Sequence, residues 1–209
     1  MRCPLALLAL LALQGLLLGC ATDPRELAET DRTMPPSTPT TAPDPGDGVA
    51  PGAGSITEEG ATEQLTLTSP AFAAGAPIPA AHACDGAATS PPLAWSGVPE
   101  SAIELAVVVV DPDAGGFAHW VIAGIDPATT GIAAGAVPAG AVEATNDTGG
   151  IGWAPPCPPP ADGPHTYELT LYALDRSPAI APGGSPTPAI AAIEASALGR
   201  DLLMGTHDR

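Results

Sequence analysis

The chain has 209 residues, and its 23 Asp and Glu residues outnumber its 6 Lys and Arg residues, which gives a formal net charge of −17. Nucleic acids and anionic lipid surfaces are bound by clustered Lys and Arg, so a chain of this charge repels both over most of its surface. The composition therefore argues against a nucleic acid partner, and solubility is the simplest explanation of the acidity.

The first segment, Met1–Cys20, has the features of an export signal. Arg2 is followed by a run of leucine and alanine that ends in Leu-Leu-Gly-Cys. The run is too short for a stable transmembrane span, and its ending matches the bacterial lipobox, in which the cysteine is acylated. We therefore predict a lipoprotein signal peptide at residues 1–19 and an extracytoplasmic protein anchored to a bacterial membrane by lipid on Cys20. An ordinary signal peptide with a chance cysteine and an uncleaved anchor are the alternatives.

The next segment, residues 20–63, is rich in Pro, Thr, Gly, Ala and acidic residues. It holds too few large apolar groups to offset the entropy lost on ordering, so we predict a disordered tether, stiffened by its prolines. A proline-rich docking site is the alternative, although no aromatic or basic companion motif accompanies it.

Residues 64–209 have the length of a single domain with its own core. Period-two patterns of apolar residues or β-branched runs predict strands at Gln64–Thr68, Ile103–Val110, Trp120–Ala123 and His165–Leu174. Only Pro188–Met204 has apolar residues at the spacing of a helix, and Gly205 is expected to end that helix. We therefore predict a mainly β domain of antiparallel sheets with a C-terminal helix packed on one side.

Polar residues extend the apolar faces of three of these strands. Asp111 continues the face of Ile103, Leu105, Val107 and Val109. His165 and Tyr167 share a face with two leucines, and His119 has Val121 and Ala123 behind it. Turn-forming aspartates and hydrogen-bonded core histidines are the simpler interpretations of each residue alone. Three such strand ends together favour a shared pocket.

Two cysteines remain in the predicted mature domain, Cys84 and Cys157. In an oxidising compartment, two thiols favour a disulfide. Two buried free thiols and a two-cysteine metal site remain open, because the sequence does not say how far apart they lie.

The segments with the most specific residue patterns are Ser90–Pro99, Asp111–Ala114, Phe117–Val121, Cys157–Pro159 and Gly163–Tyr167. In this order and spacing they resemble the phosphatidylethanolamine-binding protein family, in its bacterial Raf kinase inhibitor-like (YbhB/YbcL-type) branch. The resemblance runs from about Leu65 to Arg209. It implies a large antiparallel sheet packed on a smaller sheet, with helices near the C-terminus.

The resemblance also implies a pocket for small anionic or phosphate-bearing ligands, phospholipid head groups among them. Its ligand-binding residues, carried over by motif, are Asp111, His119, Pro158, His165 and Tyr167. Imidazole, phenol and backbone donors would bind the anion, more strongly below about pH 6.5, where an ordinary histidine gains its proton. The prediction includes no catalytic residue, cofactor or metal, and it identifies no protein partner.

Two other functions compete with this prediction. An inhibitor or scaffold would bind a protein through the pocket rim. A metal-dependent hydrolase would use Asp111, His119 and His165 as ligands, but no H-x-x-x-H pair or G-x-S-x-G elbow accompanies them. Three departures from the family pattern, at Ala114–Gly116, at Trp153–Pro156 and at His207, bear on pocket width and ligand choice.

Overall fold

The computed structural model describes residues 64–209. The predicted signal peptide at 1–19, the lipidation site Cys20 and the tether at 20–63 lie outside the described residues, so these stay predictions. Within the described part of the chain, no helix combines the length and the apolar character needed to cross a membrane.

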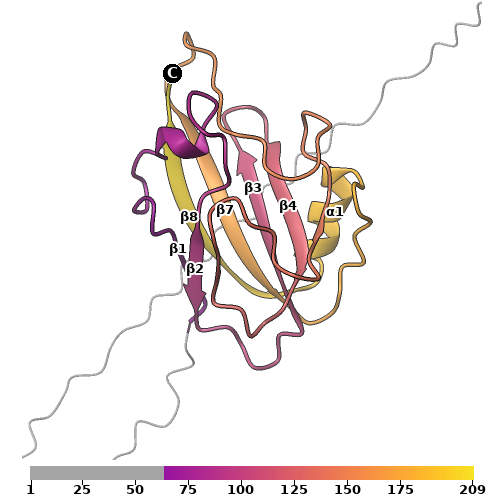
Figure 1. Cartoon of the computed structure of the whole chain (residues 1–209). Helices are drawn as coiled ribbons and strands as arrows, with labels where there is room; N and C mark the ends of the chain where they lie inside the picture. Colours follow the sequence, from indigo (N-terminus) through magenta and orange to yellow (C-terminus); the bar gives the residue numbers. More distant parts are fainter. Residues whose placement is uncertain (1–63) are drawn as a thin grey trace, which may run out of the picture. The chain divides into compact units, whose positions relative to one another are not determined.

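The domain consists of two antiparallel sheets and one α-helix (Figure 1). The larger sheet has the order β6-β4-β3-β7-β8, with β6 at Val142–Glu143, β4 at Phe117–Ile125, β3 at Glu104–Asp111, β7 at His165–Leu174 and β8 at Ala197–His207. The smaller sheet has the order β1-β2-β5, with β1 at Thr66–Thr68, β2 at Leu93–Ser96 and β5 at Gly131–Ile132. A 3-10 turn spans Ala80–His82, and α1 spans Pro186–Glu194. The predicted fold class is confirmed.

The larger sheet is buried on both faces. On β3, Leu105 and Val109 belong to the main core, which includes apolar side chains of the smaller sheet, while Val108 belongs to a second cluster with Ile193 of α1. A strand buried on both sides reads as a continuous apolar run, as β3 does. Ile103, predicted to begin this strand, instead precedes it and is 59% exposed, which corrects that prediction.

The predicted helix at Pro188–Met204 is wrong over its second half. The helix begins earlier, at Pro186, ends at Glu194, and is followed by β8, which pairs with β7 along its whole length. Leu203 and Gly205 are buried, whereas Leu198, Leu202 and Met204 are exposed, which is the alternation expected of a strand. Gly205 disfavours a helix and permits close packing, since a Cβ there would lie 2.6 Å from Ile78 Cγ1. Pairing with β7 therefore overrides the helical spacing.

Candidate functional site

Asp111 and His165 form a buried pair at one end of the larger sheet. They lie on the neighbouring strands β3 and β7, and Asp111 is only 2% exposed. His165 Nδ1 lies 2.7 Å from Asp111 Oδ2 and donates to it, while the backbone N–H of Ala114 donates to Oδ1 over 3.0 Å. The carboxylate is thus held from two directions.

The hydrogen bond to Asp111 raises the pKa of His165 above its ordinary value, against the opposing effect of burial. The negative charges of Asp111, Asp113 and Asp162 shift this pKa in the same upward direction. Because Nδ1 is engaged with Asp111, the protonated ring presents Nε2–H as its remaining donor. The pair therefore favours the protonated, cationic form of His165.

His119 reaches the same place through an irregularity in β4. The ladder pairs Val109 with Trp120 but Val110 with Ala118, so His119 is an extra residue without a partner on β3. Such a bulge shifts the alternation of the strand and redirects a side chain. The prediction that His119 lies on the face of Val121 and Ala123 is therefore wrong, because those two belong to the cluster under α1. His119 instead packs edge-on against Tyr167, with ring centroids 5.1 Å apart.

Burial lowers the pKa of His119, and the nearby imidazole of His165 lowers it further. The hydrogen bond to the carbonyl of Ala154, at 2.8 Å from Nδ1, and the charges of Asp111 and Asp147 oppose this shift. The two histidines of the site thus shift in opposite directions, because only His165 hydrogen bonds to a carboxylate.

Tyr167 contributes a phenol from β7 and is 1% exposed. Burial raises the pKa of Tyr167, and the charges of Asp111 and Asp113 add to the effect. The hydroxyl therefore keeps its proton over the physiological range and is able to donate to a ligand oxygen.

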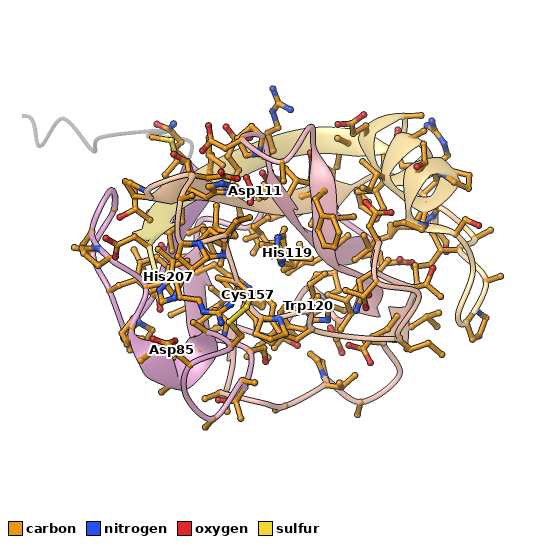
Figure 2. The ribbon with its side chains drawn as sticks, turned by 90° about the horizontal axis from the view of Figure 1, so that it is seen from above. Asp85, Asp111, His119, Trp120, Cys157 and His207 are labelled. Atoms are coloured by element: carbon orange, nitrogen blue, oxygen red, sulfur yellow. A yellow bond between two sulfur atoms is a disulfide. The ribbon has the colours of Figure 1, made fainter. Side chains whose placement is uncertain are left out.

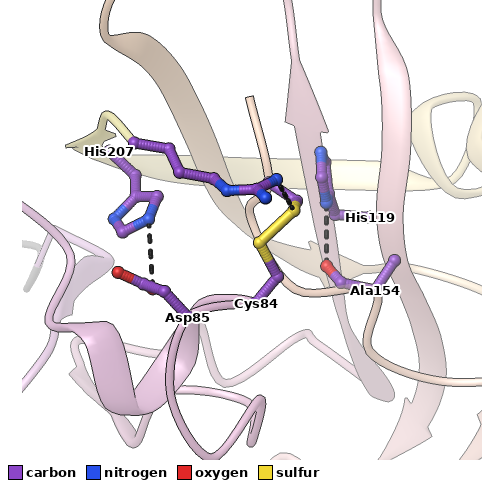
Figure 3. The surroundings of a disulfide bond; sticks show 7 residues. Cys84, Asp85, His119, Ala154 and His207 are labelled. Carbon is purple, nitrogen blue, oxygen red and sulfur yellow. Dashed lines mark hydrogen bonds and ion pairs between the residues drawn. A yellow bond between two sulfur atoms is a disulfide. The ribbon is translucent and has the colours of Figure 1, made fainter. Parts of the chain in front are cut away.

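A proline-rich loop forms the opposite wall of the site. Cys157 in this loop is joined by a disulfide to Cys84, with the two Cα atoms 5.4 Å apart and a sequence separation of 73 (Figure 3). The backbone N–H of Cys84 also donates to the carbonyl of Pro156 over 3.0 Å. Trp153 anchors the start of the loop, since its indole N–H donates to the carbonyl of His82 over 3.2 Å. The covalent bond and these hydrogen bonds hold the wall in place.

The strands and the loop enclose a cavity of about 380 Å³. Figure 2, which views this end of the domain, shows Asp111 and His119 near Cys157. All five residues carried over by motif line the cavity, namely Asp111, His119, Pro158, His165 and Tyr167. Its size falls in the range of small-molecule sites, and its mixture of apolar walls and a few polar groups is typical of them.

Several other residues that line the same cavity had no binding role assigned from the sequence, namely Ala114, Phe117, Thr148, Ala154, Pro155 and Pro159. Ala114, Phe117 and Pro159 stood inside quoted motifs, and Ala154 and Pro155 stood in a departure from the family pattern, so their positions were a usable signal. Ala154 acts through its carbonyl, and no side-chain pattern predicts that contact.

His207, a predicted departure from the family pattern, lies opposite His165 in the β7–β8 ladder. It is buried, its Nδ1 donates weakly to the carbonyl of Ile78 over 3.4 Å, and its Nε2 lies 3.5 Å from Asp85 Oδ1. It lies beside His165 on the neighbouring strand and is not among the residues that line the cavity.

The hydrolase alternative required a metal-binding set of side chains. Among residues 64–209, no group of three or more His, Cys, Asp and Glu side chains is arranged to hold a metal ion. Asp111 and His165 bond to each other, and His119 directs its Nδ1 toward a backbone carbonyl.

The fold and the site define a two-sheet β domain whose larger sheet ends in a mostly apolar cavity lined by a few polar groups. The model of the family described as phosphatidylethanolamine-binding protein matches residues 68–208. The chain belongs to this family.

Relatives agree with this assignment. The chain is 41% identical over 209 residues to a Mycobacterium tuberculosis protein named "Putative lipoprotein LppC", covering 99% of this chain and 96% of that one. The crystal structure of Escherichia coli YbcL, described as a member of the mammalian PEBP family, matches with a TM-score of 0.66 at 29% identity, covering 70% of this chain and 99% of YbcL. A phosphatidylethanolamine-binding protein homolog from Chlamydia trachomatis, CT736, matches with a TM-score of 0.65 at 36% identity, covering 70% and 99%.

Proposed function

We propose that this domain is an extracytoplasmic binding module for small anionic or phosphate-bearing ligands, phospholipid head groups among them. The observation that carries the proposal is the buried Asp111–His165 pair, which stabilises a cationic donor on the wall of a cavity of about 380 Å³. His119 and Tyr167 line the same cavity. The family's description, which names a phospholipid, supports the phosphate-bearing class of ligand.

Binding should rest on short-range contacts. The chain carries a net charge of −17, so its long-range field opposes the approach of an anion. One charge-assisted hydrogen bond from His165, and a neutral one from Tyr167, would supply the attraction inside the cavity. We therefore expect modest affinity that improves as His165 is protonated, and the raised pKa of His165 places that improvement above the pH of about 6.5 of an ordinary histidine.

Calorimetry and thermal denaturation of the full-length chain, purified in detergent, test the proposal. Phosphoethanolamine and inorganic phosphate should each raise the melting temperature at pH 6.5, because a ligand that binds only the folded state stabilises it. The shift should disappear in His165→Ala. The matched control is Glu168→Gln, which changes a side chain outside the cavity on the same strand and should keep the shift. No binding of either compound by the unaltered chain would contradict the proposal.

The same proposal places the domain on a membrane through lipid on Cys20. The match to LppC, a protein named as a lipoprotein, extends over 99% of this chain and thus includes the N-terminal segment, which supports the anchor. Cys20→Ala should abolish incorporation of a labelled fatty acid and release the protein from the membrane fraction. Cys3→Ala, within the predicted signal peptide, is the control and should leave both unchanged.

A further inference from the structure

The cavity offers an anion a cationic donor but no net positive charge. Among the described residues that line it, Asp111 is the one carboxylate, and there is no lysine or arginine. The cationic donor, His165, lies 2.7 Å from that carboxylate, so the charges of the two groups cancel when His165 is protonated. One bound negative charge therefore finds one charged donor, and a second negative charge finds none.

Two further carboxylates lie on the His165 side of the cavity. Asp113 accepts a hydrogen bond from the backbone N–H of Thr166 over 2.7 Å, which holds this carboxylate one residue away from His165. After the hydrogen bond to Asp111, the charges of Asp113 and Asp162 also raise the pKa of His165. Carboxylates that favour the cationic imidazole disfavour an anion at the same place, and they disfavour a dianion more than a monoanion.

The opposite side of the cavity adds little positive charge. Asp147 accepts a hydrogen bond from the backbone N–H of Ala118 over 2.7 Å, one residue away from His119. One cation reaches the proline-rich loop, since Nη1 of Arg209 donates to Cys157 Sγ over 3.2 Å. Arg209 is exposed and does not line the cavity, so solvent and salt screen its charge.

The walls of the cavity cannot solvate a second charge. They include Phe117 and three prolines, and a proline has no N–H to donate. The N–H of Ala154 already donates to the carbonyl of His119, and the hydroxyl of Thr148 donates to Asn146. A second negative charge would therefore lose its hydration against apolar walls without gaining a cationic partner, which is unfavourable.

We propose that the cavity selects ligands with a single negative charge, phosphodiesters above all, over dianions such as sulfate and the fully ionised form of phosphate monoesters. The inference rests on the proposed function, since it assumes that the cavity binds small anions, and it adds the charge that the ligand carries. The two free oxygens of a phosphodiester accept hydrogen bonds from His165 and Tyr167, and its two ester groups contact the apolar walls. The phosphate that links a phospholipid head group to its glycerol is a diester of this kind.

Four small ligands separate the charge of an anion from its chemical type. Dimethyl phosphate and methyl sulfate are monoanions and sulfate is a dianion at every pH of the measurement, whereas methyl phosphate changes from monoanion to dianion near its second pKa of about 6. NMR titrations of the full-length chain in detergent, at constant ionic strength, should show methyl sulfate binding roughly tenfold more tightly than sulfate. Sulfate that binds as tightly as methyl sulfate would overturn the proposal.

The pH dependence gives a second measurement that needs no variant. Charged or titratable groups surround His165 from the neighbouring strands and loops, namely Asp111, Asp113, His119, Asp162, Tyr167 and His207. Dimethyl phosphate keeps one charge, so its affinity reports the protonation of these protein groups alone. The ratio of methyl phosphate affinity to dimethyl phosphate affinity cancels that contribution.

This ratio should be near one at about pH 5 and should fall at least tenfold by about pH 8, because roughly one hundredth of the monoester keeps its second proton two units above a pKa of about 6. A ratio that stays constant or rises with pH would overturn the proposal.

A cation added to the lining should weaken the preference for monoanions. Thr148 is exposed and lines the cavity, so Thr148→Lys places an ammonium group beside the ligand without changing the core. Sulfate affinity should rise roughly fivefold more than methyl sulfate affinity, as expected for a close charge pair. Thr130→Lys is the control, because it adds the same charge at an exposed position outside the lining, and it should leave the preference within about twofold.

The double variant Asp113→Asn, Asp162→Asn removes two of the carboxylates near His165. It should shift the preference toward sulfate by roughly threefold, since two repulsive charges are lost. An unchanged preference both in this variant and in Thr148→Lys would overturn the proposal.

The outcomes keep the two proposals apart. Binding of all four ligands with equal affinity would refute the selection by charge and leave the binding module in place. Binding of none of them would refute the proposed function together with this inference.

Discussion

The two sides of the cavity are positioned by different means. On one side, Asp111, His119 and Tyr167 project from β3, β4 and β7, whose ladder fixes their separation. On the other side, the loop that contains Pro158 has no ladder and depends on the Cys84–Cys157 disulfide and a few backbone hydrogen bonds. We call these the strand side and the loop wall.

Because the two sides are held differently, they should control different properties of the site. The strand side carries the groups with shifted pKa values, so it should determine the charge and hydrogen bonding of the ligand. The loop wall contributes mainly proline rings, so it should determine the shape of the cavity. Changes on one side should leave the property of the other intact.

The largest effect is expected from removing the disulfide in the double variant Cys84→Ser, Cys157→Ser. On the entropic model, a cross-link that closes a loop of this length (73 residues apart) contributes about 4 kcal/mol to the free energy of unfolding. Chemical denaturation measures the loss. The pKa of His165, followed by NMR, should not change, and a change would mean that the two sides are coupled.

Asp111→Asn should produce the next largest effect, on the strand side. Without the carboxylate, the pKa of His165 falls toward its ordinary value of about 6.5, so a smaller fraction of the ring is cationic above that pH. Phosphate affinity at pH 7.5 should fall roughly tenfold or more, as expected for losing a charge-assisted hydrogen bond. Glu168→Gln also removes one negative charge. It should leave the pKa of His165 unchanged and the phosphate affinity within twofold of that of the unaltered chain. Retained affinity in Asp111→Asn would exclude a role for the pair in binding.

A pH series separates the two histidines. The folded-state pKa of His165 is raised, so its pair with Asp111 stabilises the domain fully below about pH 6.5 and loses this effect as the pH rises through the raised pKa. The folded-state pKa of His119 is lowered, so its burial costs stability as the pH falls below about 6.5. A double-mutant cycle of Asp111 and His165 should therefore give a larger coupling energy at pH 6 than at pH 9. Equal coupling at both values would show that His165 does not change its protonation between pH 6 and pH 9, against this prediction.

The smallest effect is expected from Pro158→Ala in the loop wall. Releasing a proline makes the unfolded chain more flexible and should lower stability by about 0.4–1 kcal/mol. Because Pro158 is buried and lines the cavity, phosphate affinity should also fall, by about twofold. Pro160→Ala is the control, since Pro160 is exposed in the same loop and outside the lining, and it should lower stability alone.

Sequence periodicity was sufficient where strands are regular. The alternation of β3 and β7 placed Asp111, His165 and Tyr167 at one end of the main core, and the structure has them there. Periodicity gave the wrong face for His119 on β4, because the bulge there reverses the alternation of side chains. The bulge depends on how β4 pairs with β3, which the sequence pattern does not show. Periodicity also failed at β8, where helical spacing was overridden by the ladder with β7.

The sequence by itself determined the family, the mainly β class and the residue types that meet in the cavity, because these follow from local periodicity and from motifs. Only the tertiary structure decided that Cys84 reaches Cys157, and that one histidine is bonded to a carboxylate and the other to a carbonyl. The reason is physical. A pKa shift and a hydrogen-bond role depend on which groups from distant segments approach within about 3 Å, and no local pattern encodes that distance.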